Sequence, residues 1–286
     1  MTITEPGIYP DVPEDIYHAD TDLAPELGRS LSASGAKTLL RNPARFQWER
    51  DHPRPSTDSM DLGSVAHHLI LKRGGDLLIV DAYDWKAPAN QKIRKEQRAK
   101  GVVVVHRGEF AQAVRMARAV LQHIWSIDGE TVGTLGETLF AKGEPEVSLY
   151  WIDEATGVTC RGRIDWLHPA AIVDVKTARD ASPYGFAKAC ADYGYRESAA
   201  HYSKGVRVLK GEALPFYLVV VEAAAPHLVA VYRFADTDLA YGEERMAEAL
   251  TTYAACESSG DWPGYPADVQ TLEMPRWASA YVPKEF

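Results

Sequence analysis

The chain has 286 residues, of which 46% are hydrophobic and 25% are charged; these are ordinary globular proportions and argue against wholesale disorder. At this length we expect one domain with additional segments rather than two small domains. The net charge of −9 and the pI near 5.5 argue against a protein that coats nucleic acid non-specifically, because such coating depends on Lys and Arg that neutralise phosphates.

Neither a membrane nor secretion is indicated. No stretch approaches the roughly 18 apolar residues of a membrane span, and residues 1–20 lack the basic and apolar regions of a signal peptide, so we expect a cytoplasmic protein without a membrane partner. Cys160, Cys190 and Cys256 are widely spaced, which favours neither a disulfide framework nor a CxxC metal site. Three cysteines are also too few for a four-cysteine iron–sulfur cluster within one chain.

The beginning of the chain is expected to be extended and then helical. Residues 1–30 are rich in Pro, Asp and Glu without periodicity, which predicts an extended arm. A helix capped by Ser32 or Ser34 should follow. Pro43 should interrupt or restart this helix before a Pro-rich break at residues 52–58.

Two further helices are predicted over residues 63–72 and 109–125, where apolar residues recur at helical spacing. Between them, residues 74–107 combine Gly, Pro and many charges and include QKIRKEQRAK, the most basic run of the chain. This run either contacts DNA or forms a solvated helix face, and the second situation is the commoner one.

Short strands joined by turns follow, a pattern typical of hairpins and a mixed sheet. They are expected at residues 137–142, 146–153, 158–167 and 171–177. The other regular elements are expected to be helices at 184–191 and 196–209, strands at 215–223 and 227–235, and a helix at 237–254. The tail after this helix is rich in Pro and aromatic residues and should wrap the surface.

The sharpest local feature is Asp165 followed nine residues later by Asp174-Val175-Lys176. Strand periodicity places Asp174 and Lys176 on one face, and Asp165 reaches that face across a hairpin. Two carboxylates and an ammonium are costly there unless a metal or substrate compensates them. Mg²⁺ favours oxygen ligands, so the two carboxylates would bind it. Lys176 would then orient a metal-bound water or stabilise the charge that develops on phosphorus. A surface Asp–Lys pair is the alternative for the tripeptide alone.

The tripeptide belongs to a longer pattern over residues 146–206. A glutamate opens one strand, R-x-D-W ends the next, I-V-D-V-K-T forms the third, and a tyrosine-bearing helix follows. This order resembles the nuclease core of the RecE or exonuclease VIII group within the PD-(D/E)xK superfamily. Upstream, LSASGAKTLLRNPARFQWE and LGSVAHHLILK resemble the Ser-rich helix start and the Gly-x-x-x-His helix of that group, so the resemblance spans about residues 31–210.

The resemblance implies an α/β fold with a PD-(D/E)xK nuclease core, in which a central mixed β-sheet is flanked by helices. The nuclease domain with its N-terminal helical region is then expected at residues 31–256. The extended arm at residues 1–30 precedes it, and the irregular tail at residues 257–286 follows it.

The resemblance also implies a Mg²⁺-dependent exodeoxyribonuclease that degrades linear double-stranded DNA from 5′ to 3′. The 3′ single-stranded tails would serve a RecT-like annealing protein in phage or prophage recombination, and Mn²⁺ is expected to substitute for Mg²⁺. A ring-shaped homo-oligomer is implied as well. A net charge of −9 makes non-specific gripping of duplex DNA poor, and a ring threaded by its substrate would retain the DNA topologically.

Carried over by position, Asp165 and Asp174 are metal ligands, the Val175 carbonyl and Glu146 are further ligands, and Lys176 is the catalytic lysine. Asp165, Asp174 and Glu146 thereby belong to the catalytic set as well. Taken alone, a glutamate in a strand is more often solvated.

His67 corresponds to the helix histidine that approaches the metal in this group, where its neutral imidazole is expected to serve as a metal ligand or to hold a bound water. The neighbouring His68 points about 100° away on a helix, so only one of the two faces the site. The spacing after Gly63 favours His67.

DNA contacts are expected from Arg161 and Arg163, which share a strand face with the first aspartate; a structural salt bridge is the competing interpretation for each. After the lysine strand the group commonly presents a Gln and then a Tyr. Here Ser198 stands at the Gln position, and Tyr195 and Tyr202 remain. All three are expected near DNA, and weaker phosphate candidates are Lys37, Arg41, Arg45 and Lys204.

Two rival functions stay open. One is another endonuclease or exonuclease of the PD-(D/E)xK superfamily. The other is a DNA-binding protein on a catalytically decayed nuclease fold, which Ser198 favours and the complete carboxylate and lysine set disfavours.

Overall fold

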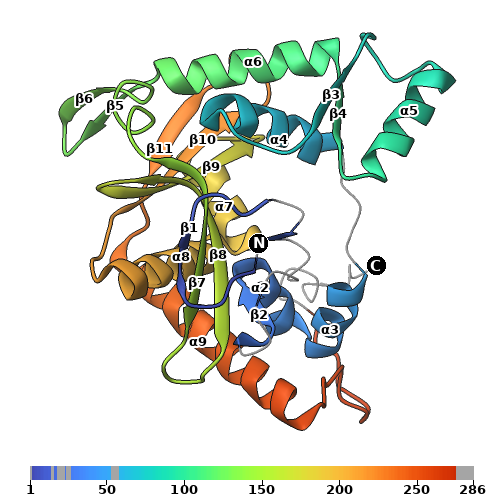
Figure 1. Ribbon diagram of the computed structural model, residues 1–286, viewed down its shortest axis with the longest axis vertical. Coiled ribbons are helices and arrows are strands. Elements are labelled where there is room, and N and C mark those ends of the chain that lie inside the picture. Colours follow the sequence, from blue (N-terminus) through green and yellow to red (C-terminus); the bar gives the residue numbers. More distant parts are fainter. Residues whose placement is uncertain (1, 14–15, 18–22, 24–26, 53–57, 275–286) are drawn as a thin grey trace, which may run out of the picture.

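A seven-stranded mixed sheet lies at the centre of the described structure (Figure 1). The computed structural model describes residues 2–13, 16–17, 23, 27–52 and 58–274. The strands run in the order β1 (Gly7–Tyr9), β7 (Glu144–Ile152), β8 (Thr159–His168), β9 (Ala171–Ala178), β10 (Phe216–Glu222) and β11 (Val229–Tyr232), and β2 (Ser30–Ser32) pairs with β8.

Strands β9 and β10 are parallel, with Asp174 opposite Leu218 and Lys176 opposite Val220. A parallel pair needs a long crossover, and α7 (Pro183–Tyr193) and α8 (Tyr195–Lys210) supply it. The other neighbouring strands of the main path are antiparallel. The expected central mixed sheet is therefore confirmed.

Helices cover the sheet on both faces (Figure 1). One face packs against α2 (Ala33–Arg41), α3 (Pro43–Asp51), α8 and α9 (Asp236–Ser259), and the other against α4 (Asp58–Leu71) and α6 (Arg107–Gln122). Leu218 belongs to the first core and Val219 to the second. The unbroken apolar run of β10 follows from this burial on both faces.

Two smaller units flank this body. At one end, β3 (Leu77–Val80) and β4 (Val103–His106) pair in parallel and are joined through α5 (Pro88–Arg98). At the other end, β5 (Ile124–Ile127) and β6 (Glu130–Thr134) form a hairpin. Figure 1 shows the two units on opposite sides of α4 and α6.

The helix starts follow the capping chemistry that the sequence suggests. The side chain of Ser32 accepts a hydrogen bond from the backbone N–H of Gly35, and Asn42 caps α3 in the same way with Pro43 at its first turn. Ser32 is therefore the cap of α2, and Pro43 restarts the helix as expected. Of the predicted Pro-rich break, residues 53–57 lie outside the described residues.

Two expectations were wrong. The predicted strand at residues 137–142 is a series of turns, in which the Thr138 hydroxyl donates to the Thr134 carbonyl while Leu139 packs into the second core. The helix predicted to reach residue 125 ends at Gln122, because the following residues pair as the β5–β6 hairpin.

The start of the chain takes part in the fold. Strand β1 pairs with β7, and Ile3, Val12 and Tyr17 pack on the fully buried Tyr150. At the other end, Trp262 packs against the first core, and residues 260–274 contain neither helix nor strand. Within the described residues, no helix combines the length and apolar character needed to cross a bilayer.

One buried histidine makes the stability of the fold depend on pH. His201 of α8 is 2% exposed, and its Nε2 donates to the Arg161 carbonyl at 2.9 Å. Burial lowers the pKa of His201 to about 4. Because the folded pKa lies below the ordinary value of 6.5, this contribution to stability is complete above pH 6.5 and is lost as the pH falls toward 4.

We expect the free energy of unfolding to fall by about 3 kcal/mol from this residue between pH 7.5 and 4. In His201→Gln the dependence over that interval should shrink, whereas in the control His52→Gln, at an exposed position, it should not change. Urea titrations at several pH values measure the free energy of unfolding of each protein. Equal pH dependence in all three proteins would contradict the assignment.

Candidate active site

The site lies where β8 and β9 diverge. Main-chain pairing between the two strands covers Trp166 to His168 of β8 only. The next residue toward the fork is Asp165, whose Oδ2 accepts a hydrogen bond from the backbone N–H of Val175 at 2.7 Å. The Asp165 carboxylate thus accepts the N–H that a main-chain carbonyl of β8 would otherwise accept, and the backbone of β9 holds it in place.

Asp174 and Lys176 extend from the same face of β9, as strand periodicity requires. Lys176 Nζ lies 2.5 Å from Asp174 Oδ2 and 3.9 Å from Asp165 Oδ2. Burial by itself lowers the pKa of Lys176, but the two carboxylates outweigh it and raise that pKa. For Asp174 burial is the larger effect and, with the nearby charge of Asp165, raises its pKa.

His67 approaches the same carboxylates from α4. Its Nε2 lies 3.0 Å from Asp165 Oδ2 and its Nδ1 lies 3.2 Å from Glu146 Oε1. Burial lowers the pKa of His67, but the two carboxylates raise it further, to about 10. The imidazolium therefore bridges β7 and β8 at the fork.

Glu146 reaches the site through an unusual backbone conformation. Its φ is 56°, which non-glycine residues rarely adopt, and it lies between the paired residues Pro145 and Val147 of β7. Such a conformation costs roughly 1–3 kcal/mol. The cost is consistent with a position where the direction of the carboxylate matters more than stability.

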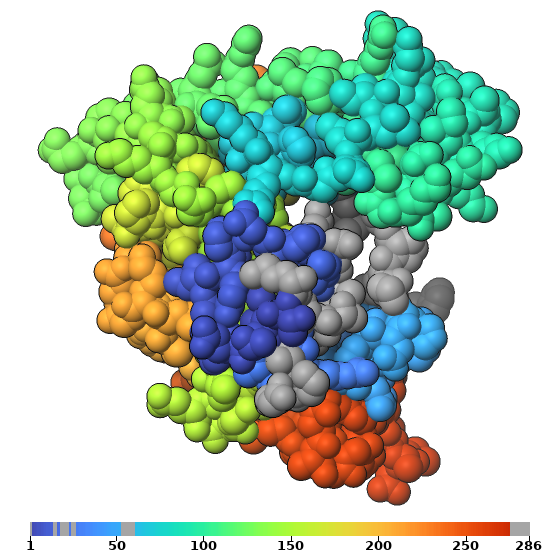
Figure 2. Space-filling view, viewed as in Figure 1, coloured from blue at the N-terminus to red at the C-terminus, as the bar shows by residue number. Residues whose placement is uncertain are grey.

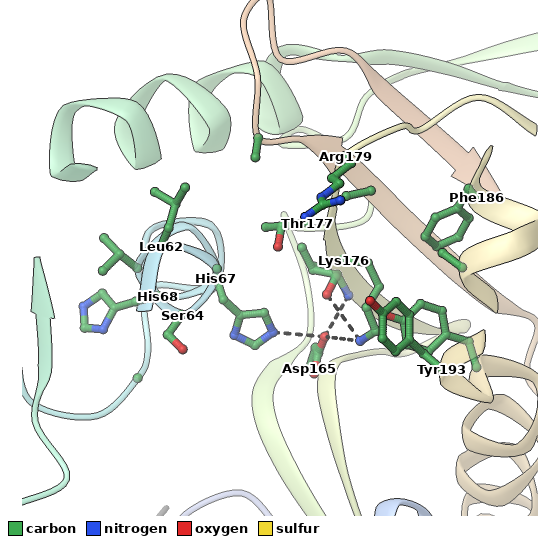
Figure 3. A pocket seen from close by; sticks show the side chains of 18 of the residues that line it. Leu62, Ser64, His67, His68, Asp165, Lys176, Thr177, Arg179, Phe186 and Tyr193 are labelled. Carbon is green, nitrogen blue, oxygen red and sulfur yellow. Dashed lines mark hydrogen bonds and ion pairs between the residues drawn. The ribbon is translucent and has the colours of Figure 1, made fainter. Parts of the chain in front are cut away.

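A cavity of about 1130 Å³ opens over this cluster. His67, Asp165 and Lys176 lie in its wall together with Thr177, Arg179 and other residues (Figure 3). A Cβ at Gly63 would lie 3.2 Å from the Thr177 hydroxyl, so the glycine lets α4 approach β9. This close approach brings His67 within reach of the strand carboxylates.

The donor set fits a hard divalent cation, although its present arrangement does not. Among the described residues, no group of three or more His, Cys, Asp or Glu side chains is placed to hold a metal ion. Lys176 and His67 instead pair with the carboxylates. Carboxylate and carbonyl oxygens are the ligands that Mg²⁺ prefers, and Glu146, Asp165 and Asp174 would exchange these ion pairs for the metal.

Comparison with known proteins agrees with this geometry. Residues 32–274 match the family described as a PDDEXK-like domain of unknown function (DUF3799). The chain belongs to this family. The family name refers to the two carboxylates and the lysine of the motif, the residue types that Asp165, Asp174 and Lys176 bring together here. No curated protein matches the chain.

One solved structure shares this fold. A "putative exonuclease" from Eubacterium rectale superposes with a TM-score of 0.60 at 15% sequence identity, covering 95% of this chain and 99% of that chain. A second structure, that of SSO0001, reaches a TM-score of 0.28 at 15% identity, with 69% and 87% of the two chains covered. The first comparison shows a shared fold over nearly the whole chain, and the second carries no weight.

The structure separates the two arginines from the cavity of the PD-(D/E)xK site. Arg163 donates to the Val12 carbonyl at 2.6 Å and lies 3.6 Å from Glu146. The guanidinium groups of Arg161 and Arg163 lie 5.2 and 4.5 Å from the centre of the Tyr17 ring. The beginning of the chain thus packs on both side chains, as the salt-bridge interpretation expects for Arg163.

The two tyrosines of α8 differ in position. The ring of Tyr195 lies 5.4 Å from Lys176 Nζ and lines the cavity. Tyr202 packs against Gly162, and burial raises its pKa well above the ordinary value. Tyr195 is therefore placed to touch a substrate, whereas Tyr202 is a packing residue behind the site.

Ser198, at the position of the expected Gln, binds a lysine from another helix. Lys37 Nζ donates to the Ser198 hydroxyl and to the Tyr193 carbonyl, each at 3.0 Å. Burial and the charge of Lys176 lower the pKa of Lys37 to about 8. Two other weak phosphate candidates have protein partners: Arg41 donates to the Asp192 carbonyl and Lys204 pairs with Asp153.

Several cavity residues carried no signal in the sequence. Arg179, Phe186 and Tyr193 follow β9 or belong to α7, yet they line the same cavity. Tyr193 is 62% exposed, and the centre of its ring lies 5.8 Å from that of Tyr195. Only the fold relates these positions to the motif residues.

The two adjacent histidines should differ in their effect on catalysis. Figure 3 shows His67 pointing toward Asp165 and Lys176 and His68 pointing away from them. We expect His67→Ala to lower the turnover number at least about tenfold, the usual effect of losing a residue that orients metal ligands, and His68→Ala to leave it near the wild-type rate. Rates at several Mg²⁺ concentrations test this, and equal activity of the two variants would remove His67 from the site.

Proposed function

We propose that the protein is a metal-dependent deoxyribonuclease that hydrolyses phosphodiester bonds at the β8–β9 fork. The observation that carries the proposal is the convergence of Asp165, Asp174 and Lys176: Asp165 and Lys176 lie in the wall of a large cavity, and Asp174 lies 2.5 Å from the Lys176 ammonium. Buried like charges of this kind are expensive to maintain in a sheet unless a ligand uses them.

Each residue has a distinct task in this reaction. Glu146, Asp165 and Asp174, with the Val175 carbonyl, would hold the metal, and the Val175 oxygen already lies 3.4 Å from Lys176 Nζ. When bound there, the metal would polarise the phosphate and lower the pKa of a water molecule. Lys176 then orients the attacking water or stabilises the charge that develops on the phosphate oxygens.

We further infer an exonuclease on linear double-stranded DNA that acts from 5′ to 3′ in the cytoplasm and uses Mg²⁺, with Mn²⁺ as a substitute. Its 3′ tails would pass to a RecT-like annealing protein in phage or prophage recombination. The resemblance to the RecE or exonuclease VIII group supports this substrate. That group and the net charge of −9 also support a ring-shaped homo-oligomer around the DNA.

A second candidate is a DNA-binding protein on a decayed nuclease fold. It is favoured by Ser198, whose hydroxyl is occupied by Lys37 where the related group commonly presents a Gln. It is disfavoured by the complete set of Glu146, Asp165, Asp174 and Lys176. Hydrolysis separates the two candidates, because only the enzyme degrades DNA when metal is added.

Digestion of matched DNA substrates tests the proposed reaction. With Mg²⁺ or Mn²⁺ we expect linear duplex to be degraded, covalently closed circles to remain intact, and a chelator to stop the reaction. Light scattering at micromolar concentration reports the assembly. A monomer that nicks closed circles as fast as it degrades linear duplex would move the assignment to an endonuclease, and no hydrolysis under any condition would favour the DNA-binding candidate.

Two variants should lose activity for different reasons. Asp174→Ala should abolish both Mn²⁺ binding and hydrolysis, because it removes a ligand. Lys176→Ala should retain Mn²⁺ binding and lose about 100-fold or more in rate, the usual effect of removing a group that stabilises the transition state. Calorimetry with Mn²⁺ and a gel assay distinguish them, with the thermal midpoint as the folding control. Wild-type hydrolysis by Asp174→Ala would refute the site.

A further inference from the structure

The unit at residues 77–106, here termed the basic arm, has a charge opposite to that of the whole chain. Residues 86–100 contain six Lys or Arg and one Glu, whereas the chain has a net charge of −9. Figure 1 shows the arm projecting beside α4, with α5 at its outer end, and Figure 2 shows it as a lobe at the upper right of the molecule. Positive charge is therefore concentrated on one projecting unit.

Helix α5 is not held in place by a hydrophobic core, since none of its residues is buried. A helix that is polar on all sides needs other anchors, and its inner side has two. Arg94 lies 4.4 Å from the centre of the Trp85 ring, and the Trp85 Nε1 donates to Glu109 of α6 at 3.1 Å. The second anchor is Arg98, which pairs with the buried Asp61 of α4.

The Arg98–Asp61 pair fixes the arm relative to the candidate active site. Arg98 Nε donates to Asp61 Oδ2 at 2.7 Å, and Asp61 is 3% exposed. His67 follows on the same helix, about 9 Å further along the axis. One rigid helix thus carries both the anchor of the arm and a residue of the site.

The cavity also reaches the base of the arm. Its wall continues from His67 and Lys176 to Arg73, Leu77 and Val103, which lie at or before the starts of β3 and β4. A polymer whose scissile phosphate lies at Lys176 therefore has a path along this wall toward α5.

The outer side of α5 is free for a polyanion. Lys92 and Lys95 of α5 are exposed, as is Lys100, two residues after the helix ends, and Lys92 makes only a loose pair with Glu96 at 3.8 Å. The helix is about 16 Å long, which matches about five phosphates of one DNA strand at their 3.4 Å spacing. Flexible lysine ammonium groups bind phosphate without reading sequence.

We propose that the basic arm binds the sugar–phosphate backbone of duplex DNA beside the point of cleavage, through Lys92, Lys95 and Lys100. This inference rests on the proposed function, because it assumes that DNA is cleaved in the cavity beside the arm. The acidic remainder of the chain repels DNA elsewhere, so the arm orients the duplex as well as retaining it.

Binding without hydrolysis tests the arm. The variant Lys92→Gln/Lys95→Gln/Lys100→Gln is compared with the charge-matched control Arg207→Gln/Lys210→Gln/Arg233→Gln, whose residues belong to α8 or follow β11, across the molecule from α5 in Figure 1. Kd for a labelled 30-base-pair duplex is measured in chelator between 50 and 200 mM KCl, and thermal midpoints verify folding.

We expect the arm variant to bind about tenfold or more weakly at 100 mM KCl and the slope of log K against log salt to fall by about 2 to 3, near 0.9 per lost phosphate contact. The control should change Kd by less than about twofold. An arm variant that matches the control would overturn the inference, and so would a wild-type protein without measurable affinity for duplex, a result that would leave an acidic protein as the occupant of the arm.

The same variants separate this inference from the proposed function. A dinucleoside monophosphate has a single phosphate, which is the one cleaved at the site, so it offers none to the arm and its metal-dependent hydrolysis should be equal in the wild type and the arm variant. Loss of duplex affinity in the arm variant, with no hydrolysis by the wild type, would support the arm and refute the nuclease. Hydrolysis by the wild type, with unchanged duplex affinity in the arm variant, would support the nuclease and refute the arm.

Discussion

Two carboxylates, the partly buried Asp165 and the buried Asp174, lie at the point where β8 and β9 separate, and the surrounding structure compensates their charge. Asp165 accepts the backbone N–H of Val175, and Lys176 and His67 supply positive charge. Because unpaired charges inside a sheet are prohibitively costly, the compensation dictates where α4 must lie. The glycine at position 63 and the backbone strain at Glu146 both follow from that need.

The motif residues could be placed from the sequence because their geometry is local. Alternation along a strand sets the relation of Asp174 to Lys176, and a short hairpin brings Asp165 beside them. The position of His67 depends on helix α4 packing against β9, so only the resemblance to a known group indicated it. At residues 137–142 the local pattern predicts a strand, but the segment forms a run of turns whose Leu139 packs into the second core.

Other parts of the site could not be predicted, because they depend on contacts between distant segments. Lys37 meets Ser198 across 161 positions of sequence, and no spacing rule relates them. The cavity wall combines the start of the basic arm with α7. Strand alternation places Arg163 on the face of Asp165, but it does not predict that the Val12 segment covers Arg163. Periodicity tells which face of a strand a residue occupies, and it does not tell what later covers that face.

The first residues of the chain have a consequence for how the sheet behaves in solution. Strand β1 pairs with Ser148 to Tyr150 of β7, on the side of β7 away from β8. An uncovered strand edge presents free N–H and C=O groups to any other extended chain. A shortened protein that starts at residue 31 would retain every motif residue, yet it would expose this edge together with Tyr150, and self-association through β7 would compete with correct folding.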